Sequence, residues 1–236
     1  MTGITTAFGA LRVTFLGAPL LALTVSCAST QAPDVTHDGL VKIPESEFAL
    51  VYAKPDVSVA DYSEFAIADC DVAFRKNWLR DQNTGNRTVL NRVGEDDVKR
   101  IREALSSLCT EEFTAALTTS PEYKLVSMAD VGANTLVLEP NIINLDISAP
   151  DTQSPGRTMS FTTNETGEMT LSLDVKDGTS GEPLFRVIDR RRSTQTGRLQ
   201  WTNSVTNTAE AKRILRVWGE KLRQGLDQVV GAPEGM

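Results

Sequence analysis

The residues that could carry acid–base or metal chemistry are few and scattered along the chain. His37 is the only histidine, so a Ser-His-Asp triad or a histidine-rich zinc site would have to be built around it. Asp69 and Asp71 would share one face of a strand, but no third ligand is spaced nearby. Glu112 falls within an apolar helical stripe, either as a buried general base or with its carboxylate at the edge of the stripe. We therefore expect no catalytic residues, no metal site and no cofactor.

Cys70 and Cys109 are candidates for a disulfide. Cys70 lies in a small-residue apolar run at 65–72 that predicts a buried strand, and Cys109 lies on the apolar stripe of a predicted helix. An exported protein folds where disulfides persist, and closing a loop of about 40 residues contributes roughly 3 to 4 kcal/mol in the chain-entropy model. The alternative is a pair of buried thiols that act as small hydrophobic side chains.

Cys27 is predicted to carry a lipid. The first twelve residues contain one basic side chain and no acid, and the apolar stretch VTFLGAPLLALTV leads from them to Ser26 and Cys27. This pattern is typical of a secretory signal peptide, and the stretch is shorter than the about 20 apolar residues that a spanning helix needs. The small residue before the cysteine resembles a bacterial lipoprotein signal, in which the cysteine is acylated. Simple cleavage nearby is the alternative.

These features divide the chain into a signal peptide at 1–26, a flexible tether at 27–37, a single domain at 38–232 and a tail at 233–236. The tether is polar, contains Pro33 and reaches at most roughly 35 to 40 Å when extended. Ala28 follows the cysteine, whereas an aspartate there retains similar lipoproteins in the inner membrane. We therefore expect a lipid anchor at the periplasmic face of the outer membrane.

Beyond the tether, hydrophobic periods of two and of 3.6 residues alternate. Strands are expected at 47–54, 65–72, 123–127, 135–148, 169–175 and 184–189, and helices at 95–117 and from Asn207, where Glu210 completes a capping box, to 230. Pro140 predicts a bulge or an edge in its strand. The order β-β-α-β-β-β-β-α predicts an α/β fold: a single-domain sandwich in which two helices pack on one face of a mixed, mostly antiparallel sheet.

Several segments together resemble a known family. They are the Gly39-Leu40 opening, the Tyr-x-Lys-Pro step at 52–55, the stretch GANTLVLEPNIINLDISAP, the hairpin at 167–192 and the W-x-x-x-L-R-x-x-L-D pattern at 218–227. The chain is similar in these parts to an uncharacterised family of Gram-negative envelope lipoproteins, domain of unknown function thirty-three thirteen. The resemblance covers nearly all of the mature chain. It implies a lipoprotein that faces the periplasm, and it brings no established activity or catalytic residues.

Charge is distributed unevenly along the sequence. The net charge of -7 and the pI near 4.9 make nucleic acid an unsuitable partner, because phosphate binding needs a basic surface. From Arg186 onward, however, ten basic and five acidic residues give a net charge of +5. Arg190, Arg191, Arg192 and Arg198 could form a basic ridge that binds an acidic partner or a wall polymer. The alternative is that they neutralise the acidic remainder of the same fold.

Two functions from different classes remain at this point. The first, which we prefer, is a non-enzymatic binding or scaffold module that is held at the membrane by its lipid and joins another envelope protein. The second is a carboxylate-based enzyme that acts on envelope glycan. Two facing carboxylates about 5 to 10 Å apart in a deep pocket would favour the enzyme. A flat surface, or a groove lined by the polar loop at 149–167, would favour the binding module.

Overall fold

The computed structural model describes residues 32–84, 92–119, 124–148, 161–163, 167–192, 200–202 and 204–230. The expected signal peptide, Cys27 and the tail at 233–236 lie outside these ranges. Residues from Pro33 onward form one compact unit. Within the described ranges, no helix combines the length and the hydropathy that a membrane crossing requires.

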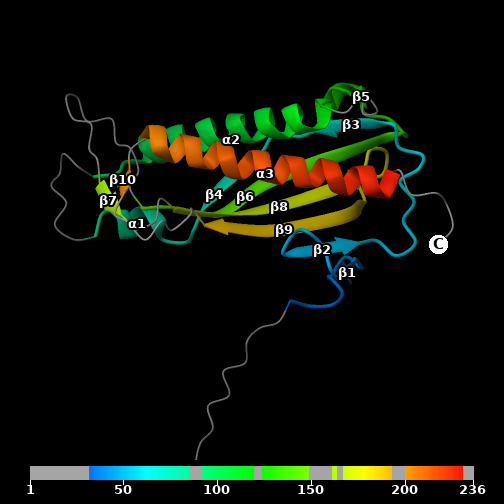
Figure 1. The fold of residues 1–236 in the computed structure, drawn as a ribbon, viewed down its shortest axis with the longest axis horizontal. Coiled ribbons are helices and arrows are strands. Elements are labelled where there is room, and N and C mark those ends of the chain that lie inside the picture. The colour runs from blue at the N-terminus through cyan, green and yellow to red at the C-terminus, as the bar shows by residue number, and fades with distance from the viewer. Residues whose placement is uncertain are drawn as a thin grey trace, which may run out of the picture. The chain divides into compact units, whose positions relative to one another are not determined.

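One sheet of eight strands organises this unit (Figure 1). Its strands lie in the order β1-β2-β9-β8-β6-β3-β5, and β4 also pairs with β6. Their bounds are β1 Val41–Ile43, β2 Leu50–Ala53, β3 Glu64–Ile67, β4 Asp71–Phe74, β5 Lys124–Leu125, β6 Thr135–Ile147, β8 Gly167–Asp177 and β9 Pro183–Arg192. β3 runs parallel to β5 and β6, and β4 runs parallel to β6, whereas the other pairs are antiparallel. A separate ladder joins β7 (Phe161–Thr163) to β10 (Gln200–Thr202).

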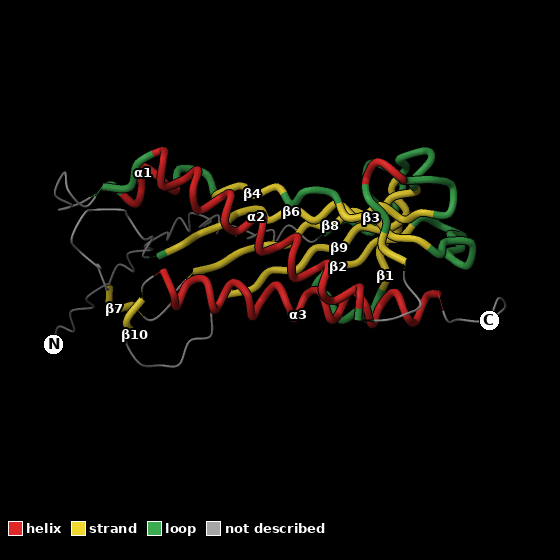
Figure 2. The backbone as a smooth tube through the Cα atoms, turned by 90° about the horizontal axis from the view of Figure 1, so that it is seen from above, coloured by secondary structure: helices red, strands yellow, loops and turns green. Residues whose placement is uncertain are grey.

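Two long helices, α2 (Glu95–Thr118) and α3 (Ser204–Val230), pack on one face of this sheet (Figures 1 and 2). The predicted α/β fold class, with its mixed and mostly antiparallel sheet, is confirmed. The short helices α1 (Trp78–Gln82) and η2 (Met128–Asp130), and the strands β1, β4, β7 and β10, are additions to the predicted order. α3 begins three residues before the predicted cap, so Asn207 lies inside the helix.

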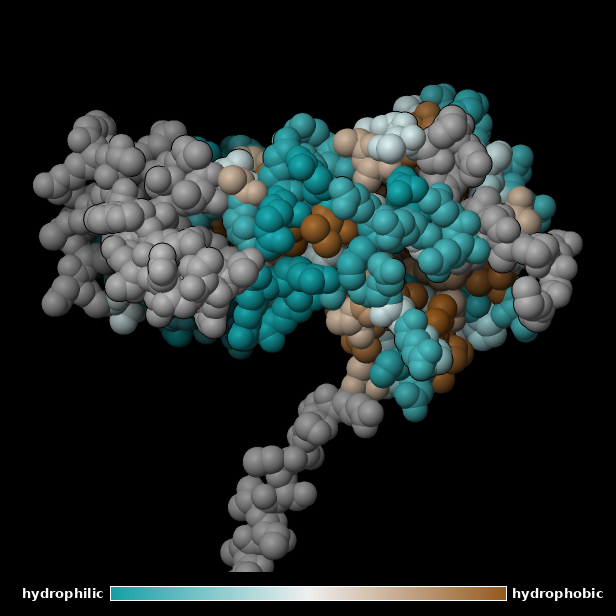
Figure 3. Space-filling model, viewed as in Figure 1, coloured by the Kyte–Doolittle hydropathy of each residue, from teal (hydrophilic) through white to brown (hydrophobic). Residues whose placement is uncertain are grey.

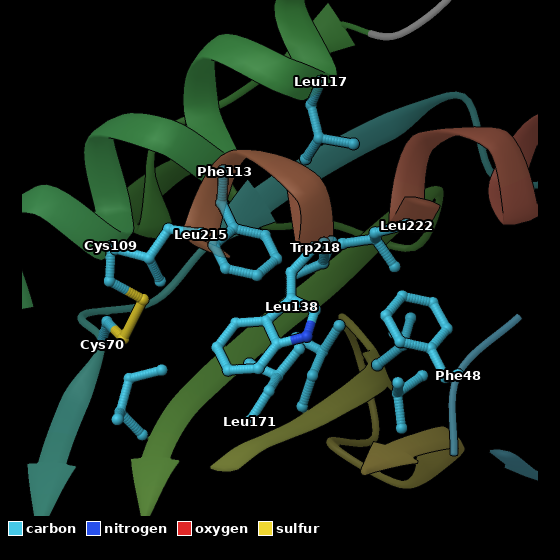
Figure 4. Packing of buried hydrophobic residues seen from close by; sticks show 14 of the residues in the cluster. Phe48, Cys70, Cys109, Phe113, Leu117, Leu138, Leu171, Leu215, Trp218 and Leu222 are labelled. Carbon is cyan, nitrogen blue, oxygen red and sulfur yellow. A yellow bond between two sulfur atoms is a disulfide. The ribbon is translucent and has the colours of Figure 1, made fainter. Parts of the chain in front are cut away.

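The core lies between the helices and the inward faces of β6 and β8 (Figure 4). Leu138 and Leu171, from neighbouring strands, and Phe113, from α2, are completely buried. Trp218 from α3 extends its indole across them. Since burying one such side chain contributes about 1.5 to 3 kcal/mol, this layer makes a large favourable contribution to folding.

Asp189 is a buried carboxylate that joins three elements. Its Oδ2 accepts hydrogen bonds from Trp218 Nε1 at 2.8 Å and from Arg191 Nε at 2.7 Å, and its Oδ1 accepts one from the backbone N–H of Ala49 at 3.1 Å. A buried carboxylate is tolerated when it is paired and hydrogen-bonded in this way. The network fixes the rotation of α3 over β9 and the approach of the chain to β2.

The strand predicted at 65–72 is wrong as a single element, because β3 ends at Ile67 and β4 begins at Asp71. Both halves pair with β6, and Pro140 lies opposite the interruption. The carbonyl of Leu138 accepts a hydrogen bond from the N–H of Ala68, the last bond between β6 and the end of β3. Residues two apart in a strand direct their backbone groups to the same neighbour, so the backbone of Pro140 also faces the interruption. A proline without an N–H is therefore accommodated in a central strand, and the predicted edge or bulge at Pro140 is wrong.

The bulge of β6 instead lies a few residues later. The register of β6 shifts against both neighbours around Asn144, which has a positive φ of 53°. Gly167 begins β8 beside this bulge, with a φ of 154°, and a Cβ there would lie 2.3 Å from the carbonyl oxygen of Asp146. Only glycine fits so close to the bulged strand, so the bulge and Gly167 together set the end of the sheet.

A disulfide joins Cys70, in the interruption between β3 and β4, to Cys109 on α2. Their Cα atoms are 6.2 Å apart, within the range that a disulfide spans. The disulfide holds α2 to the sheet at the point where β3 and β4 leave β6 without a continuous neighbour.

Part of the predicted tether belongs to the compact unit. The hydroxyl of Tyr52 donates to the carbonyl of Pro33 at 3.0 Å, and Val35 bridges to Val41. The N–H of Lys42 also donates to the carbonyl of Asp34. The expected flexible stretch at 27–37 is thus too long, because residues 33–35 are bonded to β1 and β2 at the edge of the sheet.

Tyr62 and Asp177 connect the segment before β3 to the turn after β8. The Tyr62 hydroxyl donates to Asp177 Oδ2 at 2.7 Å, and Asp177 Oδ1 accepts from the backbone and hydroxyl of Ser180. The Ser180 hydrogen bonds lower the pKa of Asp177 to about 2, and burial followed by the Asp177 hydrogen bond raises the pKa of Tyr62 to about 12.

Removing the disulfide should destabilise the fold without changing it. For the Cys70→Ala/Cys109→Ala double variant we expect the free energy of unfolding to fall by about 3 kcal/mol, because the unfolded chain regains the entropy of an open loop. Urea denaturation with and without a reductant measures this. The reductant should weaken the parent and leave the variant unchanged. Equal urea midpoints for the parent and the variant under oxidising conditions would contradict the prediction.

The bonds of Asp177 should make stability depend on pH at both extremes. The lowered pKa of Asp177 stabilises the fold above about pH 4, and this stabilisation is lost as pH falls toward 2. The raised pKa of Tyr62 stabilises the fold below about pH 10, and that stabilisation is lost as pH rises toward 12. The free energy of unfolding of Asp177→Asn at pH 7 should therefore be about 1 kcal/mol lower than that of the parent. This difference should shrink near pH 2. A difference that stays constant from pH 7 to pH 2 would exclude this origin.

Candidate functional site

An apolar pocket of about 170 Å³ lies between α2, α3 and the bulged end of the sheet. The floor comes from β6 and β8 and the walls from the first halves of the two helices. Its apolar lining includes Ile101, Leu108, Leu145, Met169, Ala211 and Ile214. The pocket is thus built by the same apolar stripes that form the core, at the end where they stop meeting each other.

The helices leave room for the pocket because they spread apart toward their N-terminal ends (Figure 2). They run in the same direction, and near the middle of α3 they touch: a Cβ on Gly219 would lie 2.8 Å from the Cβ of Ala116. Glu112, on the same side of α2, is buried and pairs with Lys212 at 3.1 Å and Arg216 at 3.4 Å. Glu112 is therefore an ion-pair partner between two helices, and this contact closes the pocket at one end.

The bulge in β6 places the floor of the pocket. Beyond Asn144 the strand resumes with Leu145 and Ile147 facing the helices, and Gly167 lies against the strand with no side chain between. Ile147 and Gly167 are also the two flanks of the polar loop predicted at 149–167. That loop itself lies outside the described residues except for β7, so the structure places its two ends at the pocket and tests nothing else about it.

Glu168 and Asp146 border the pocket at the end of its floor, but their side chains lie on the outer face of the sheet, where arginines hold them. Glu168 pairs with both Arg190 and Arg192 at 2.6 Å, and Asp146 accepts from Arg75 Nε at 2.6 Å. The Arg190 hydrogen bond, opposed by burial and aided by Arg192, holds the pKa of Glu168 below its usual range. A general acid needs a raised pKa, so Glu168 is held in the opposite state, as an ionised partner of arginine.

The arrangement is suited to holding an apolar group. A dry cavity of about 150 Å³ lined by aliphatic side chains can bind benzene, so this pocket has room for an aromatic ring or a short aliphatic branch. Within the described part of the chain, no three His, Cys, Asp or Glu side chains are grouped as metal ligands would be. Asp69 and Asp71 remain exposed on either side of the disulfide, and His37 is an exposed side chain beside Asp38.

The sequence matches the family model described as "Protein of unknown function (DUF3313)" over residues 35–222. The chain belongs to this family. The family expected from the sequence is thereby confirmed, and the match spans the sheet, α2 and most of α3. No curated protein sequence matches this chain.

Solved structures share only distant similarity with the chain. The PelC dodecamer from Paraburkholderia phytofirmans is 9% identical, with 72% of this chain and 96% of that chain covered and a TM-score of 0.35. Protein XCC0632 from Xanthomonas campestris is 10% identical, with 80% and 94% covered and a TM-score of 0.38. A minor lipoprotein from Acinetobacter baumannii is 9% identical, with 70% and 92% covered and a TM-score of 0.29. Such scores do not assign a shared function.

The arginines predicted as a basic ridge do not form one surface in the structure. Arg190 and Arg192 lie on the outer face of β9 and converge on Glu168, whereas Arg191 lies on the opposite face and pairs with Asp189. Arg198 lies outside the described residues. The three described arginines therefore neutralise acids of their own hairpin, as in the alternative interpretation of the charge pattern.

No pattern in the sequence signals the pocket directly. Ile101, Leu108 and Ala211 belong to the apolar stripes of the two helices, and periodicity does not distinguish a residue under the partner helix from one beside a recess. The place where the helices touch depends on Gly219 and Ala116, which are distant in sequence. Only the polar loop, whose flanks border the pocket, pointed to this end of the sheet.

Reversing the arginines that hold Glu168 should destabilise the fold measurably. In Arg190→Glu/Arg192→Glu, three carboxylates meet where two ion pairs stood, and we expect a lower urea midpoint at low salt and a smaller decrease at high salt. Lys99→Glu is the matched control, because its pair with Glu103 is exposed on both sides. Adding Glu168→Lys should restore most of the loss. An unchanged urea midpoint for the double reversal would show that these arginines are ordinary solvated surface.

Proposed function

We propose that this protein is a non-enzymatic binding module, held by a lipid on Cys27 at the periplasmic face of the outer membrane, that receives an apolar group of another envelope protein in its pocket. The anchor is supported by the apolar stretch that ends at Ser26 and Cys27. More than one acyl chain makes such anchoring stable.

The apolar pocket between α2, α3 and the end of β6 carries the proposal. Ligand sites are typically apolar recesses with a few polar groups at the margin, and interface hot spots are typically aromatic or branched side chains set into such recesses. Ile101, Leu108 and Met169 supply the apolar lining, and Arg100 and Glu210, from the two helices, supply the polar margin. The pocket therefore offers an anchor point for one side chain and orienting charges around it.

The ion pairs of the two carboxylates at the end of the pocket floor also support binding over the alternative of carboxylate catalysis. An acid–base pair needs two carboxyl groups whose environments separate their pKa values. Glu168 and Asp146 are instead both held by arginines, and the pKa of Glu168 is lowered.

Crosslinking from the pocket in the intact envelope tests the function. A photoreactive benzoylphenylalanine at Thr208, an exposed residue of α3 at the pocket, should yield a discrete adduct that mass spectrometry identifies as one envelope protein. Ala211→Phe, which places a ring in the pocket, should reduce that adduct by about tenfold or more, since one filled hot spot costs at least about 1.4 kcal/mol.

The matched control carries the same photoreactive group at Ser107, an exposed residue on α2 that does not line the pocket. Circular dichroism and the urea midpoint should show that Ala211→Phe still folds. If the photoreactive groups at Thr208 and Ser107 captured the same proteins in the same amounts, the pocket would not be the binding site. The same conclusion would follow if Ala211→Phe left the yield of the Thr208 adduct unchanged.

A further inference from the structure

Exposed large hydrophobic side chains concentrate at one edge of the sheet. Among the described residues four such side chains are exposed: Val35 (54%), Val41 (42%) and Ile43 (39%) at the β1 edge, and Met128 (49%) elsewhere. In Figure 3, hydrophobic residues come to the surface where β1 and β2 lie. Grouped apolar exposure of this kind marks an interaction surface more often than scattered single residues do.

The three β1-edge side chains form one continuous row. Val35 bridges to Val41, so the two lie side by side, and Ile43, two residues further along the strand, points to the same face. On β2, Ala53 and Val51 are the direct partners of Val41 and Ile43 and extend the row toward the core. We call Val35, Val41 and Ile43 the edge row.

The chain that leads to the predicted anchor is bonded to this same edge. Tyr52 holds the carbonyl of Pro33, and six residue steps separate Pro33 from Cys27. Six extended residues span at most about 20 Å, and two further residue steps lead from Pro33 to Val35. The edge row therefore stays close to an acylated Cys27. The edge row is thus the described apolar surface that the anchor must hold nearest to the bilayer.

We propose that the edge row lies on the membrane surface and orients the domain there. This inference rests on the proposed lipid anchor of Cys27. Net charge does not favour contact with anionic head groups, because the chain from Cys27 onward has a charge of -8 after Arg12 is removed from the -7 of the whole chain. The contact is therefore made by aliphatic side chains inserted among the head groups.

The orientation places the pocket away from the membrane. The Lys221 ammonium donates to the carbonyl of Glu47, close to β1, whereas the pocket begins at Asn207 of the same helix. Fourteen helical residues span about 21 Å, so α3 separates the two surfaces by roughly that distance. With the edge row on the bilayer, the pocket lies at that distance along α3 from the contact, so the contact leaves it uncovered.

Tryptophan placed in the edge row tests the contact. The acylated full chain carrying Ile43→Trp is reconstituted in phosphatidylethanolamine–phosphatidylglycerol vesicles, with and without bromine on the acyl chains. Met128→Trp is the matched control, because η2 follows β5 at the opposite edge of the sheet, roughly 29 Å from β1 at about 4.8 Å per strand. The emission added by Ile43→Trp should be lost in brominated vesicles, and that added by Met128→Trp should persist.

Flotation of the parent protein with the vesicles separates the two claims. If the parent floats and both tryptophans are quenched equally or not at all, the anchor stands and the orientation is overturned. If the parent does not float, the anchor and the orientation both fail. If the emission of Ile43→Trp shifts to the blue as protein density rises, without quenching by bromine, a second copy covers the row and the membrane contact is overturned.

Val41→Thr/Ile43→Thr provides a second measurement with little risk to β1, because threonine keeps the preference for strands. In the anchored protein this pair should leave flotation unchanged and should raise the rate of protease cleavage near Pro33, since the edge no longer rests on the bilayer. Met128→Thr should leave that rate at the parent's value. Equal cleavage of all three proteins would count against the proposal.

Discussion

The inward face of β6 and β8 is covered by α2 and α3, and the placement of the other elements follows from this cover. Leu138 and Leu171 in the strands meet Phe113 and Trp218 from the helices. A single sheet with one apolar face must find such a cover, because its exposed apolar area would otherwise cost more than the chain's net stability. The Trp218 indole also reaches the buried carboxylate of Asp189, so apolar burial and the internal polar network fix the same helix in the same orientation.

Departures from regular structure are concentrated around β6. The interruption between β3 and β4 accommodates Pro140 and is held to α2 by the disulfide of Cys70 and Cys109, while the bulge at Asn144 bends the far end of the strand. The pocket lies at that bent end, where α2 and α3 have already separated. A regular sheet under two closely packed helices would have filled this volume, so the irregularities of β6 and the pocket have a common origin.

Charge in this fold is balanced locally. Glu168 between two arginines, and Glu112 between Lys212 and Arg216, show acids and bases that are distant in sequence meeting within one hairpin or across two helices. The basic residues of the C-terminal part of the sequence therefore neutralise acidic residues of the same fold and do not form one exposed cationic surface. The Arg190 hydrogen bond also holds the pKa of Glu168 below its usual range, so this carboxylate stays ionised.

The sequence by itself determined the class of fold, the family and the expectation of a lipid on Cys27, because periodicity and a signal pattern are local and survive without knowledge of contacts. It also identified the two cysteines that meet. Tertiary structure decided what no local pattern encodes. Pro140 faces an interruption, the helices touch at Gly219 and separate toward their N-terminal ends, and Arg190 pairs with Glu168. Each depends on which residues from distant segments come within a few ångströms, and the same apolar stripe can line a core or a pocket according to that distance alone.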